Sequence, residues 1–472
     1  MENNNASTAP SSEGSLGSSL KTRHLTMMGL GSTIGAGLFL GTGVGIQAAG
    51  PAVLLAYIFA GFIVVCVMQM LGEMAAASPS TGSFAVYAEK ALGHWAGFTI
   101  GWVYWFMFVM SMGVEITGAS AIMHQWFGVP PWIPALVCVL VFTVINLIAV
   151  RGFGEFEFWF AFLKIAVIVV FIVVATLLWL GVLPGTRFVG LENFTEVGFA
   201  PNGIGGIISA LLVVIIAFVG LEVITIAAAE AEEPRESIRV SVRAILWRIL
   251  FFYLGSVLLI CLLLPYSSMG QAKNAAESPF TQILAMANIP AVAGMMEIVI
   301  VVALLSAFNA QLYSTSRLLF AMSRAGNAPR ILGNIDSRGI PNRAVWVSLF
   351  FAFVSIGLQY WNPPGLLTFL MNAVGGCILV IWILIVLSEI RMRRELEKQG
   401  PLLVKMWGYP VLPWIVLILL FGIGGIMLFD DASRMQIIAI TVISAILIAV
   451  SFVVEKKNAA RKAINSSTTN KQ

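Results

Sequence analysis

A short stretch from Gly31 to Gly37 (GSTIGAG) interrupts an apolar segment that is long enough to cross a lipid bilayer. Each of its three glycines disfavours helix by roughly 1 kcal/mol relative to alanine. A helix that is broken at membrane depth exposes backbone N–H groups that only protein or a ligand can satisfy. Since the second half-helix also begins at a positive dipole end, we expect this break to bind an anionic group such as a carboxylate.

The composition is that of an integral membrane protein. Hydrophobic residues make up 59% of the 472 residues and charged residues only 11%, which lies outside the range of soluble globular chains. Apolar runs of about 20 residues mark candidate membrane helices. They predict an all-α protein with twelve spans, at residues 25–46, 51–74, 97–123, 133–150, 158–181, 204–228, 246–265, 291–318, 344–360, 365–389, 411–429 and 436–454.

The distribution of Lys and Arg predicts the orientation, because cytoplasmic loops carry an excess of these residues. With the N-terminus in the cytoplasm, 23 of the 27 Lys and Arg residues fall on the cytoplasmic side. Only Arg187, Lys273 and Arg434 fall outside, and Lys164 lies within a span. We therefore expect both termini in the cytoplasm. The net charge of +4 needs no nucleic-acid partner, because the basic residues are expected to face the anionic inner leaflet of the membrane.

The sequence gives little support for an enzyme or a cofactor. It contains no phosphate-binding loop of the Walker A type, no zinc-protease motif and no nucleophile elbow. The cysteines lie scattered within predicted spans, as small apolar residues do, and they lack the spacing of a metal site. We therefore expect no disulfide, metal or cofactor at Cys66, Cys138, Cys261 or Cys377.

The sixth span repeats the interruption of the first, because Gly220 and Glu222 lie near its middle. Breaks in spans one and six occupy matching places in two halves of five spans, which predicts an inverted-repeat (5+5) transporter with its substrate between the broken helices. A division into six plus six is disfavoured, because the central inner loop is short and the loop from Ala75 to Trp95 contains a single basic residue, Lys90. The predicted parts are a disordered cytoplasmic tail (1–20), a first repeat (21–181), a second repeat (204–389), two further helices (411–454) and a cytoplasmic tail (455–472).

Several ordered blocks then resemble the amino acid permease family of the amino acid-polyamine-organocation superfamily. They include Arg23 to Thr26 (RHLT), Gly35 to Phe39 (GAGLF), Gly72 to Met74 (GEM), Gly154 to Trp159 (GEFEFW), Thr225 to Glu230 (TIAAAE) and Ser314 to Arg317 (STSR). The resemblance covers roughly residues 20–454. Within the family the chain is most similar to bacterial aromatic amino acid permeases, with 4-aminobutyrate permeases close behind.

The resemblance implies a substrate site at the two breaks. Backbone amides of the first break would bind the substrate carboxylate, and carbonyls in the second break would accept from its ammonium group, with Phe218 as an aromatic gate. The alternative for the first break is a packing face of small residues. The full set of expected substrate-binding residues is Ser32, Thr33, Ile34, Gly35, Ala36, Gly37, Ala217, Phe218, Gly220, Glu222, Met110, Glu115 and Asn372.

Lys164 is the sharpest single candidate for energy coupling, because a lysine inside the membrane is costly. The resemblance to proton-coupled members implies that its ammonium lies near the first break, where sodium-coupled relatives of this fold bind a cation. The alternative is that the side chain extends to the membrane surface. Ser306 and Asn309 are candidates for the same cation-like site, and Glu115 and Glu222 for proton acceptors or partners of the substrate ammonium.

These observations together predict a proton-coupled secondary transporter that imports neutral amino acids, with aromatic ones favoured, by alternating access. The expected location is the bacterial cytoplasmic membrane, and the expected partners are the amino acid, protons and lipid. Alternatives left open are 4-aminobutyrate or another small neutral amino acid as substrate, and exchange in place of symport. The proton-carrying residue and the oligomeric state are also open.

Overall fold

The structure, a computed structural model, describes residues 21–80, 82–148, 153–195, 198–228, 231–266, 269, 278–287, 292–336, 339–361, 363, 365–429 and 431–469. The expected tail at 1–20 lies outside the described residues. The regular elements of the described part are all helical, as expected from the sequence. The two 3-10 turns named here are η1 (Gly50–Ala52) and η5 (Arg330–Gly333).

The α-helices follow one another along the chain. They are α1 (Thr22–Thr33), α2 (Ala36–Phe39), α3 (Gly41–Ala49), α4 (Val53–Ala77), α5 (Ser83–Leu92), α6 (His94–Phe127), α7 (Trp132–Ile148), α8 (Phe153–Trp179), α9 (Glu192–Thr195), α10 (Gly203–Ile216), α11 (Val223–Ala227), α12 (Pro234–Leu263), α13 (Pro279–Met286), α14 (Val292–Arg324), α15 (Asn342–Trp361), α16 (Leu366–Gln399), α17 (Val411–Phe429) and α18 (Asp431–Thr469).

Nine helical stretches within the described residues are long and apolar enough to cross a membrane. Two shorter apolar helices, Trp132–Leu147 and Gly203–Ile216, accompany them. The second of these is short because the chain leaves the helix at the predicted break. The length criterion also counts Ala36–Ala77 as one stretch, where the sequence predicts the end of one span and the whole of the next.

Both predicted breaks are present in the structure. The first helix ends at Thr33, Ile34 is extended (φ −80°, ψ 94°), and the helix restarts at Ala36. The second break separates α10 from α11, and within it Gly220 has φ +105°, a left-handed conformation that glycine adopts without a steric penalty. The first break is shorter than the predicted glycine-rich stretch, because residues 31–33 are still helical.

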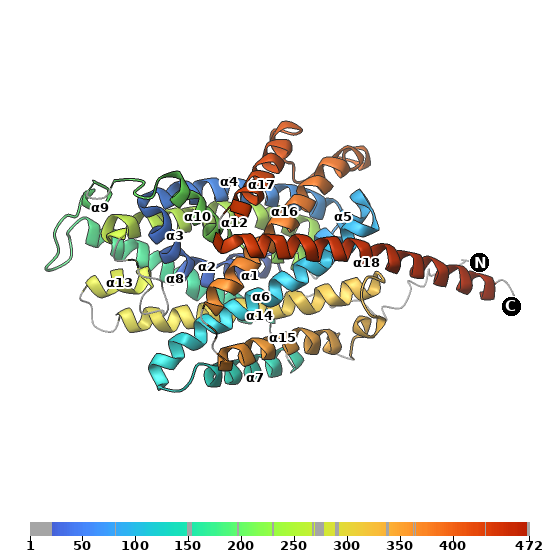
Figure 1. The fold of residues 1–472 in the computed structure, drawn as a ribbon, viewed down its shortest axis with the longest axis horizontal. Coiled ribbons are helices and arrows are strands. Elements are labelled where there is room, and N and C mark those ends of the chain that lie inside the picture. The colour runs from blue at the N-terminus through green and yellow to red at the C-terminus, as the bar shows by residue number, and fades with distance from the viewer. Residues whose placement is uncertain are drawn as a thin grey trace, which may run out of the picture.

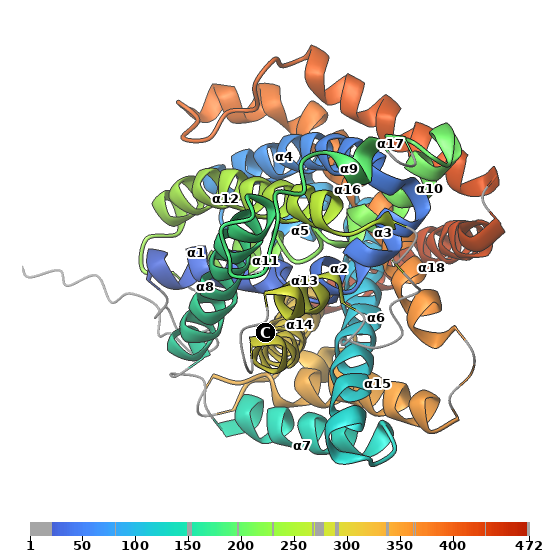
Figure 2. The ribbon, with the colours of Figure 1, turned by 90° about the vertical axis from the view of Figure 1, so that its left-hand side faces the viewer.

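The long helices run roughly parallel to one another, from a left-hand end with α9 and α13 to a right-hand end with α5 (Figure 1). Viewed along the bundle, α2 and α11 lie near its centre, surrounded by the longer helices (Figure 2). The helices α7 and α15 contact each other at one edge, and α4 contacts both α12 and α17 at the opposite edge (Figure 2). The short helices that follow the two breaks are thus enclosed, and every residue of α2 and α11 is buried.

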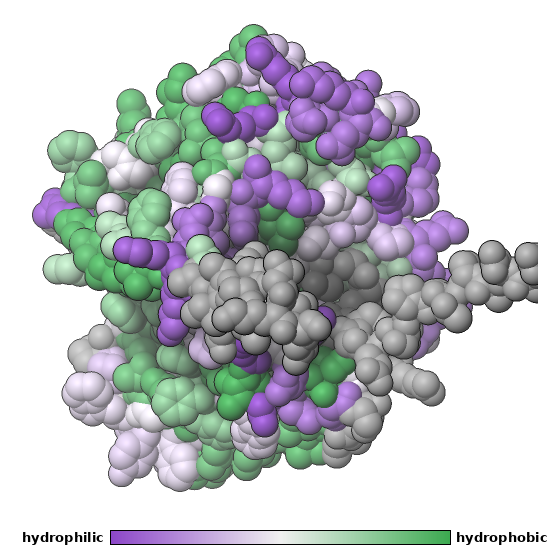
Figure 3. Space-filling model, turned by 90° about the vertical axis from the view of Figure 1, so that its right-hand side faces the viewer, coloured by the Kyte–Doolittle hydropathy of each residue, from purple (hydrophilic) through white to green (hydrophobic). Residues whose placement is uncertain are grey.

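The surface has the pattern expected of a protein surrounded by lipid. Large apolar side chains are widely exposed, for example Phe251 at 66% and Ile418 at 67%. Hydrophilic residues gather instead at the right-hand end of the bundle, beside hydrophobic flanks (Figure 3). The end of α16 carries exposed charged residues, among them Arg391 and Arg394. Exposed apolar surface of this extent marks a lipid-facing or interaction surface.

Candidate functional site

The two helix breaks pack directly against each other in the middle of the bundle. The Ser32 hydroxyl donates a hydrogen bond of 2.8 Å to the Gly220 carbonyl. A Cβ atom at Gly37 would lie only 2.6 Å from the Cα of Ala217, well inside the normal carbon–carbon contact of about 3.5 Å. The absence of a side chain at Gly37 therefore allows the backbone of the first break to approach the second this closely.

An aromatic cluster covers the breaks. The Tyr253 hydroxyl lies 3.0 Å from the Thr33 carbonyl oxygen and 2.8 Å from the Ala217 carbonyl oxygen, so its single proton is shared between one carbonyl from each break. The buried Phe218 ring packs against Tyr253, with ring centroids 5.2 Å apart, and against Tyr57, with centroids 6.4 Å apart. The Ala217 carbonyl, which the sequence identifies as an acceptor for an ammonium group, is engaged by Tyr253 in this conformation.

Glu115 of α6 lies at the start of α2. The Ala36 amide donates to its carboxylate, with N···O distances of 3.1 Å and 3.4 Å to the two oxygens. A Cβ atom at Gly35 would lie 2.6 Å from Glu115 Oε1, so this carboxylate covers the break. The structure therefore puts one of the protein's own carboxylates at the helix end where the sequence predicts an anion.

Lys164 of α8 is fully buried and donates a hydrogen bond of 2.5 Å to the Gly31 carbonyl, just before the first break. Its burial excludes the alternative in which the side chain extends to the membrane surface. When ionised, Glu157 and Glu115 both attract the ammonium group, and Glu157 does so more strongly. The lysine is therefore placed where its charge acts on the backbone of the first break.

The carboxylate of Glu157 is held by α14. Ser306 Oγ donates to Glu157 Oε2 at 3.0 Å, and Asn309 Nδ2 donates to Glu157 Oε1 at 2.8 Å. Ser306 and Asn309, both predicted from the sequence, are thus brought to the same place as Lys164 through a carboxylate that the sequence analysis did not select. We refer to Lys164, Glu157, Glu115, Ser306 and Asn309 as the buried charge group.

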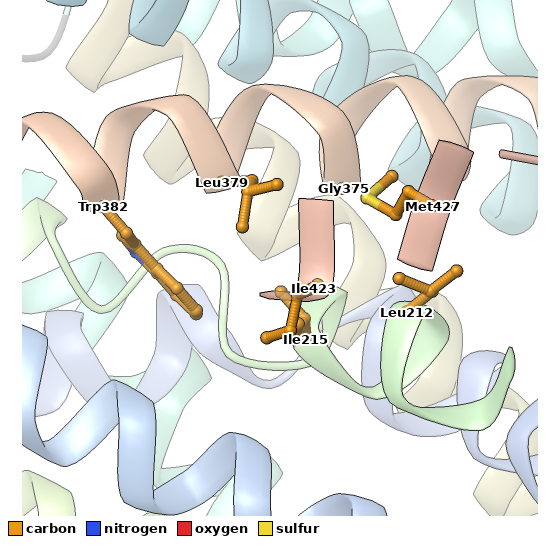
Figure 4. Close-up of a pocket in the computed structure, with 7 residues that line it drawn as sticks. All are labelled: Leu212, Ile215, Gly375, Leu379, Trp382, Ile423 and Met427. Carbon is orange, nitrogen blue, oxygen red and sulfur yellow. The ribbon is translucent and has the colours of Figure 1, made fainter. Parts of the chain in front are cut away.

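Glu222 is the last residue of the second break, directly before α11, and both of its carboxylate oxygens accept hydrogen bonds from neutral donors. The Gly220 amide donates to Glu222 Oε2, and the Trp382 indole donates to Glu222 Oε1, each at 3.1 Å. Beside this indole lies a small cavity of about 10 Å³ (Figure 4), roughly the room that one water molecule needs. Its lining comes from α10, α16 and α17 and consists of Leu212, Ile215, Gly375, Leu379, Trp382, Ile423 and Met427.

The two remaining predicted residues lie on α6 and α16. Met110 on α6 and Asn372 on α16 are both half-buried. Met110 packs against the hydrophobic core. The contacts that join the breaks come instead from Ser32 and Tyr253.

A polar cluster outside the bundle centre ties the start of α1 to α8. Glu155 accepts a hydrogen bond from Arg23 and lies 3.0 Å from His24 Nε2. The hydrogen bond to His24, together with the Arg23 guanidinium, holds the pKa of Glu155 below its ordinary value. Both ends of this contact belong to blocks that carry the family resemblance.

The sequence analysis missed Glu157, Tyr253 and Trp382. Glu157 could have been found, because it lies seven residues before Lys164 and so on the same helical face, two turns away. Tyr253 and Trp382 give no local signal, since each is one aromatic residue within a long apolar helix.

Comparisons with known proteins show the family of the chain and a related fold. A family described as "Amino acid permease" matches residues 24–461. The chain is 60% identical over 447 residues to the aromatic amino acid transport protein AroP of Corynebacterium glutamicum, covering 94% of this chain and 96% of that one. It is 38% identical over 465 residues to a gamma-aminobutyric acid permease of Bacillus subtilis, with 98% of each chain covered.

A crystal structure of a mutant manganese transporter from Eremococcus coleocola has a similar fold. The TM-score is 0.56 with 93% of this chain and 96% of that chain covered, at 14% sequence identity. The apolar helices and the family match together define a multi-pass membrane transporter. The chain belongs to the amino acid permease family, and it is accordingly a transporter and not an enzyme.

Proposed function

We propose that this chain is a proton-coupled secondary transporter that imports neutral amino acids, with aromatic amino acids preferred, by alternating access. Family membership supports the substrate class, and the 60% identity to a protein named for aromatic amino acid transport supports the preference. The pair of broken helices, whose backbone groups meet near the bundle centre, supports a site that binds both charged ends of an amino acid.

In this proposal the backbone amides of the first break, residues 32–37, bind the substrate carboxylate. The carbonyls near Ala217 and Phe218 accept hydrogen bonds from the substrate ammonium group. The region around Gly220, Glu222, Met110 and Asn372 contacts the side chain of the substrate. In the described conformation Glu115 and Tyr253 hold the same backbone groups. An arriving amino acid therefore exchanges its own charged groups for these internal partners, which avoids leaving backbone groups unsatisfied in the membrane.

The charge balance of the buried charge group is the single observation that carries the coupling proposal. Lys164, Glu157 and Glu115 are each at most 5% exposed, and fully ionised they sum to a net charge of −1. An unbalanced charge is costly inside the membrane, so one bound proton makes the group neutral. The proton belongs to the group as a whole, as is usual for strongly interacting sites.

The geometry also supports a link between this proton and the substrate. Lys164 donates to the Gly31 carbonyl before the first break, and Glu115 accepts from the Ala36 amide directly after it. A change in the protonation of the group therefore acts on the same backbone that reads the substrate carboxylate. Ser306 and Asn309 hold Glu157 in place during this change.

For the architecture we propose twelve spans in a 5+5 inverted repeat. Residues 21–181 and 204–389 form the two halves, and 411–454 hold two appended spans. The two breaks at matching positions and the two shorter apolar helices support this count. The excess of basic residues in the predicted inner loops supports a location in the bacterial cytoplasmic membrane, with both termini in the cytoplasm.

A second candidate function is 4-aminobutyrate permease. The 38% identity to a gamma-aminobutyric acid permease over 98% of both chains favours it. The two substrates differ in the distance between the amino and carboxyl groups, which is larger in 4-aminobutyrate. An amino acid exchanger would use the same residues, and dependence of the flux on internal amino acid distinguishes it.

The test is uptake of labelled phenylalanine and 4-aminobutyrate into proteoliposomes. Each substrate is offered with an inward proton gradient, with an inward sodium gradient and with no gradient. We expect concentrative phenylalanine uptake with the proton gradient alone. Concentrative uptake of 4-aminobutyrate only would reject the aromatic preference, and sodium dependence would reject the proton coupling.

A further inference from the structure

A large cavity of about 850 Å³ lies between α4, α12 and the segment that connects α16 to α17. One wall is α12, with Arg239, Arg243 and Trp247. The floor includes Gln69 of α4, and the opposite wall is the segment 402–407 that connects α16 to α17, including Lys405. Nothing in the transport proposal uses this cavity. Its volume falls within the range of small-molecule binding sites.

Hydrogen bonds with α4 hold the segment 402–407 in place as a wall of the cavity. Gln69 Nε2 donates to the Lys405 carbonyl at 2.8 Å. The Met406 amide donates to the buried carboxylate of Glu73 at 2.7 Å, and Arg393 pairs with the same carboxylate. These contacts fix the backbone of the segment against α4 and α16, so the cavity has a defined shape.

The cavity is lined with positive charge. Arg239, Arg243 and Lys405 all contribute to it, and acidic side chains are absent from its described lining. Arg239 pairs with Glu236 on its own helix. The side chains of Arg243 and Lys405 make no ion pair or hydrogen bond with any residue that the structure describes. Two basic groups are therefore available to an anion.

The mouth of the cavity opens onto lipid-facing surface. Along α12, Val240, Trp247 and Phe251 follow one helical face and are 42%, 64% and 66% exposed. On the other side Trp407, 50% exposed, leads into α17, whose Trp414 is 51% exposed. Tryptophan is enriched at the level of the lipid headgroups, where its ring is apolar and its N–H is polar.

We propose that this cavity binds the headgroup of an anionic phospholipid, with the acyl chains lying along the exposed faces of α12 and α17. Basic pockets between membrane helices at the cytoplasmic side are typical sites for such headgroups. A free phosphate ion would use the basic groups but not the two apolar helix faces. The combination of basic side chains that have no described ion pair with a mouth between lipid-facing helices therefore favours a lipid.

The test is native mass spectrometry of the purified full-length protein with phosphatidylglycerol and phosphatidylcholine added in turn. The double variant Arg243→Gln, Lys405→Gln is compared with the control Arg391→Gln, Arg394→Gln, which removes the same charge from the exposed end of α16. We expect the double variant to bind phosphatidylglycerol about 30-fold more weakly, since each basic residue near an anionic lipid surface contributes about 1 kcal/mol. We expect the control to bind it as the wild type does.

Each other outcome would overturn the proposal. Equal retention of phosphatidylglycerol and phosphatidylcholine would show that the charge is not recognised. Equal losses in the double variant and the control would show a general effect of charge. Displacement of the lipid by millimolar inorganic phosphate would identify a site for free anions. All four substituted side chains are exposed, so the variants are expected to fold, and an unchanged thermal transition verifies this.

Discussion

Replacing Gly37 by alanine tests the contact between the two helix breaks. The added Cβ would lie 2.6 Å from the Cα of Ala217, 2.9 Å from its nitrogen and 3.0 Å from the Ile216 carbonyl oxygen. All three neighbours are backbone atoms, which cannot rotate away as a side chain can. A normal carbon–carbon contact of about 3.5 Å would require the breaks to separate by roughly 0.9 Å.

The magnitude follows from the cost of overpacking. Inserting a methyl group into well-packed protein costs about 1–3 kcal/mol. At about 1.4 kcal/mol per factor of ten, the population of the closely packed arrangement falls by roughly 5- to 150-fold. If this arrangement is a step of the transport cycle, the initial rate of phenylalanine uptake falls by a similar factor.

Gly41→Ala is the matched control. It makes the same chemical change four residues later, where the nearest atoms are side-chain atoms of Met371 and Val213 at 3.5 Å, an ordinary contact. The assay is the initial uptake rate in proteoliposomes at equal protein content, for which we expect Gly41→Ala to stay within about twofold of wild type. Wild-type rates in Gly37→Ala would refute the reasoning.

Three further predictions concern single side chains. Tyr253→Phe removes the hydroxyl shared by two break carbonyls and should slow uptake about tenfold, for a lost hydrogen bond of about 1.4 kcal/mol; an unchanged rate would count against this role. Trp382→Phe leaves one oxygen of the buried Glu222 carboxylate without its hydrogen-bond donor. It should lower the free energy of unfolding by about 1–3 kcal/mol, and an unaltered thermal transition would contradict this. Because the hydrogen bond to His24 holds the pKa of Glu155 low, its ionised form stabilises the fold above the unfolded value of about 4.3, and the gain is lost as the pH falls further. Glu155→Gln should therefore melt below wild type at pH 7 and alongside it near pH 3, and a difference that is independent of pH would contradict the assignment.

The sequence could reveal where the helices break but not how long each break is. Glycine content predicted an interruption over residues 31–37. In the structure Gly31 is still helical, and a Cβ there would lie 2.8 Å from the Ala161 Cβ of α8. This glycine therefore serves the packing of α1 against α8, which was the alternative considered for the whole stretch. Which glycine opens a helix and which one packs is decided by tertiary contacts.

The candidate site was predictable in part for the same reason. Lys164, Ser306 and Asn309 stood out because polar groups are costly inside the membrane, and the structure brings them together. Their common partner, Glu157, escaped notice because it lies beside the predicted start of its span. Its hydrogen bonds come from residues about 150 positions later, and no local pattern encodes such a pairing.

The side chains that occupy the two breaks could not be identified from the sequence. The sequence predicted open amides and carbonyls, whereas Glu115 and Tyr253 fill some of these positions in the structure. Unsatisfied backbone groups at membrane depth are too costly to leave without partners. A need for internal partners follows from that principle, but the identity of the partners depends on how α6 and α12 pack around the breaks.

The most direct test of the proposed coupling is proton movement driven by the amino acid itself. Proteoliposomes enclosing a pH-sensitive dye receive an inward phenylalanine gradient with no imposed proton gradient, with wild-type protein or Lys164→Gln. We expect internal acidification that follows phenylalanine entry in the wild type and is absent in the variant. Phenylalanine entry without acidification in the wild type, or the same acidification in the variant, would contradict the role of the buried charge group.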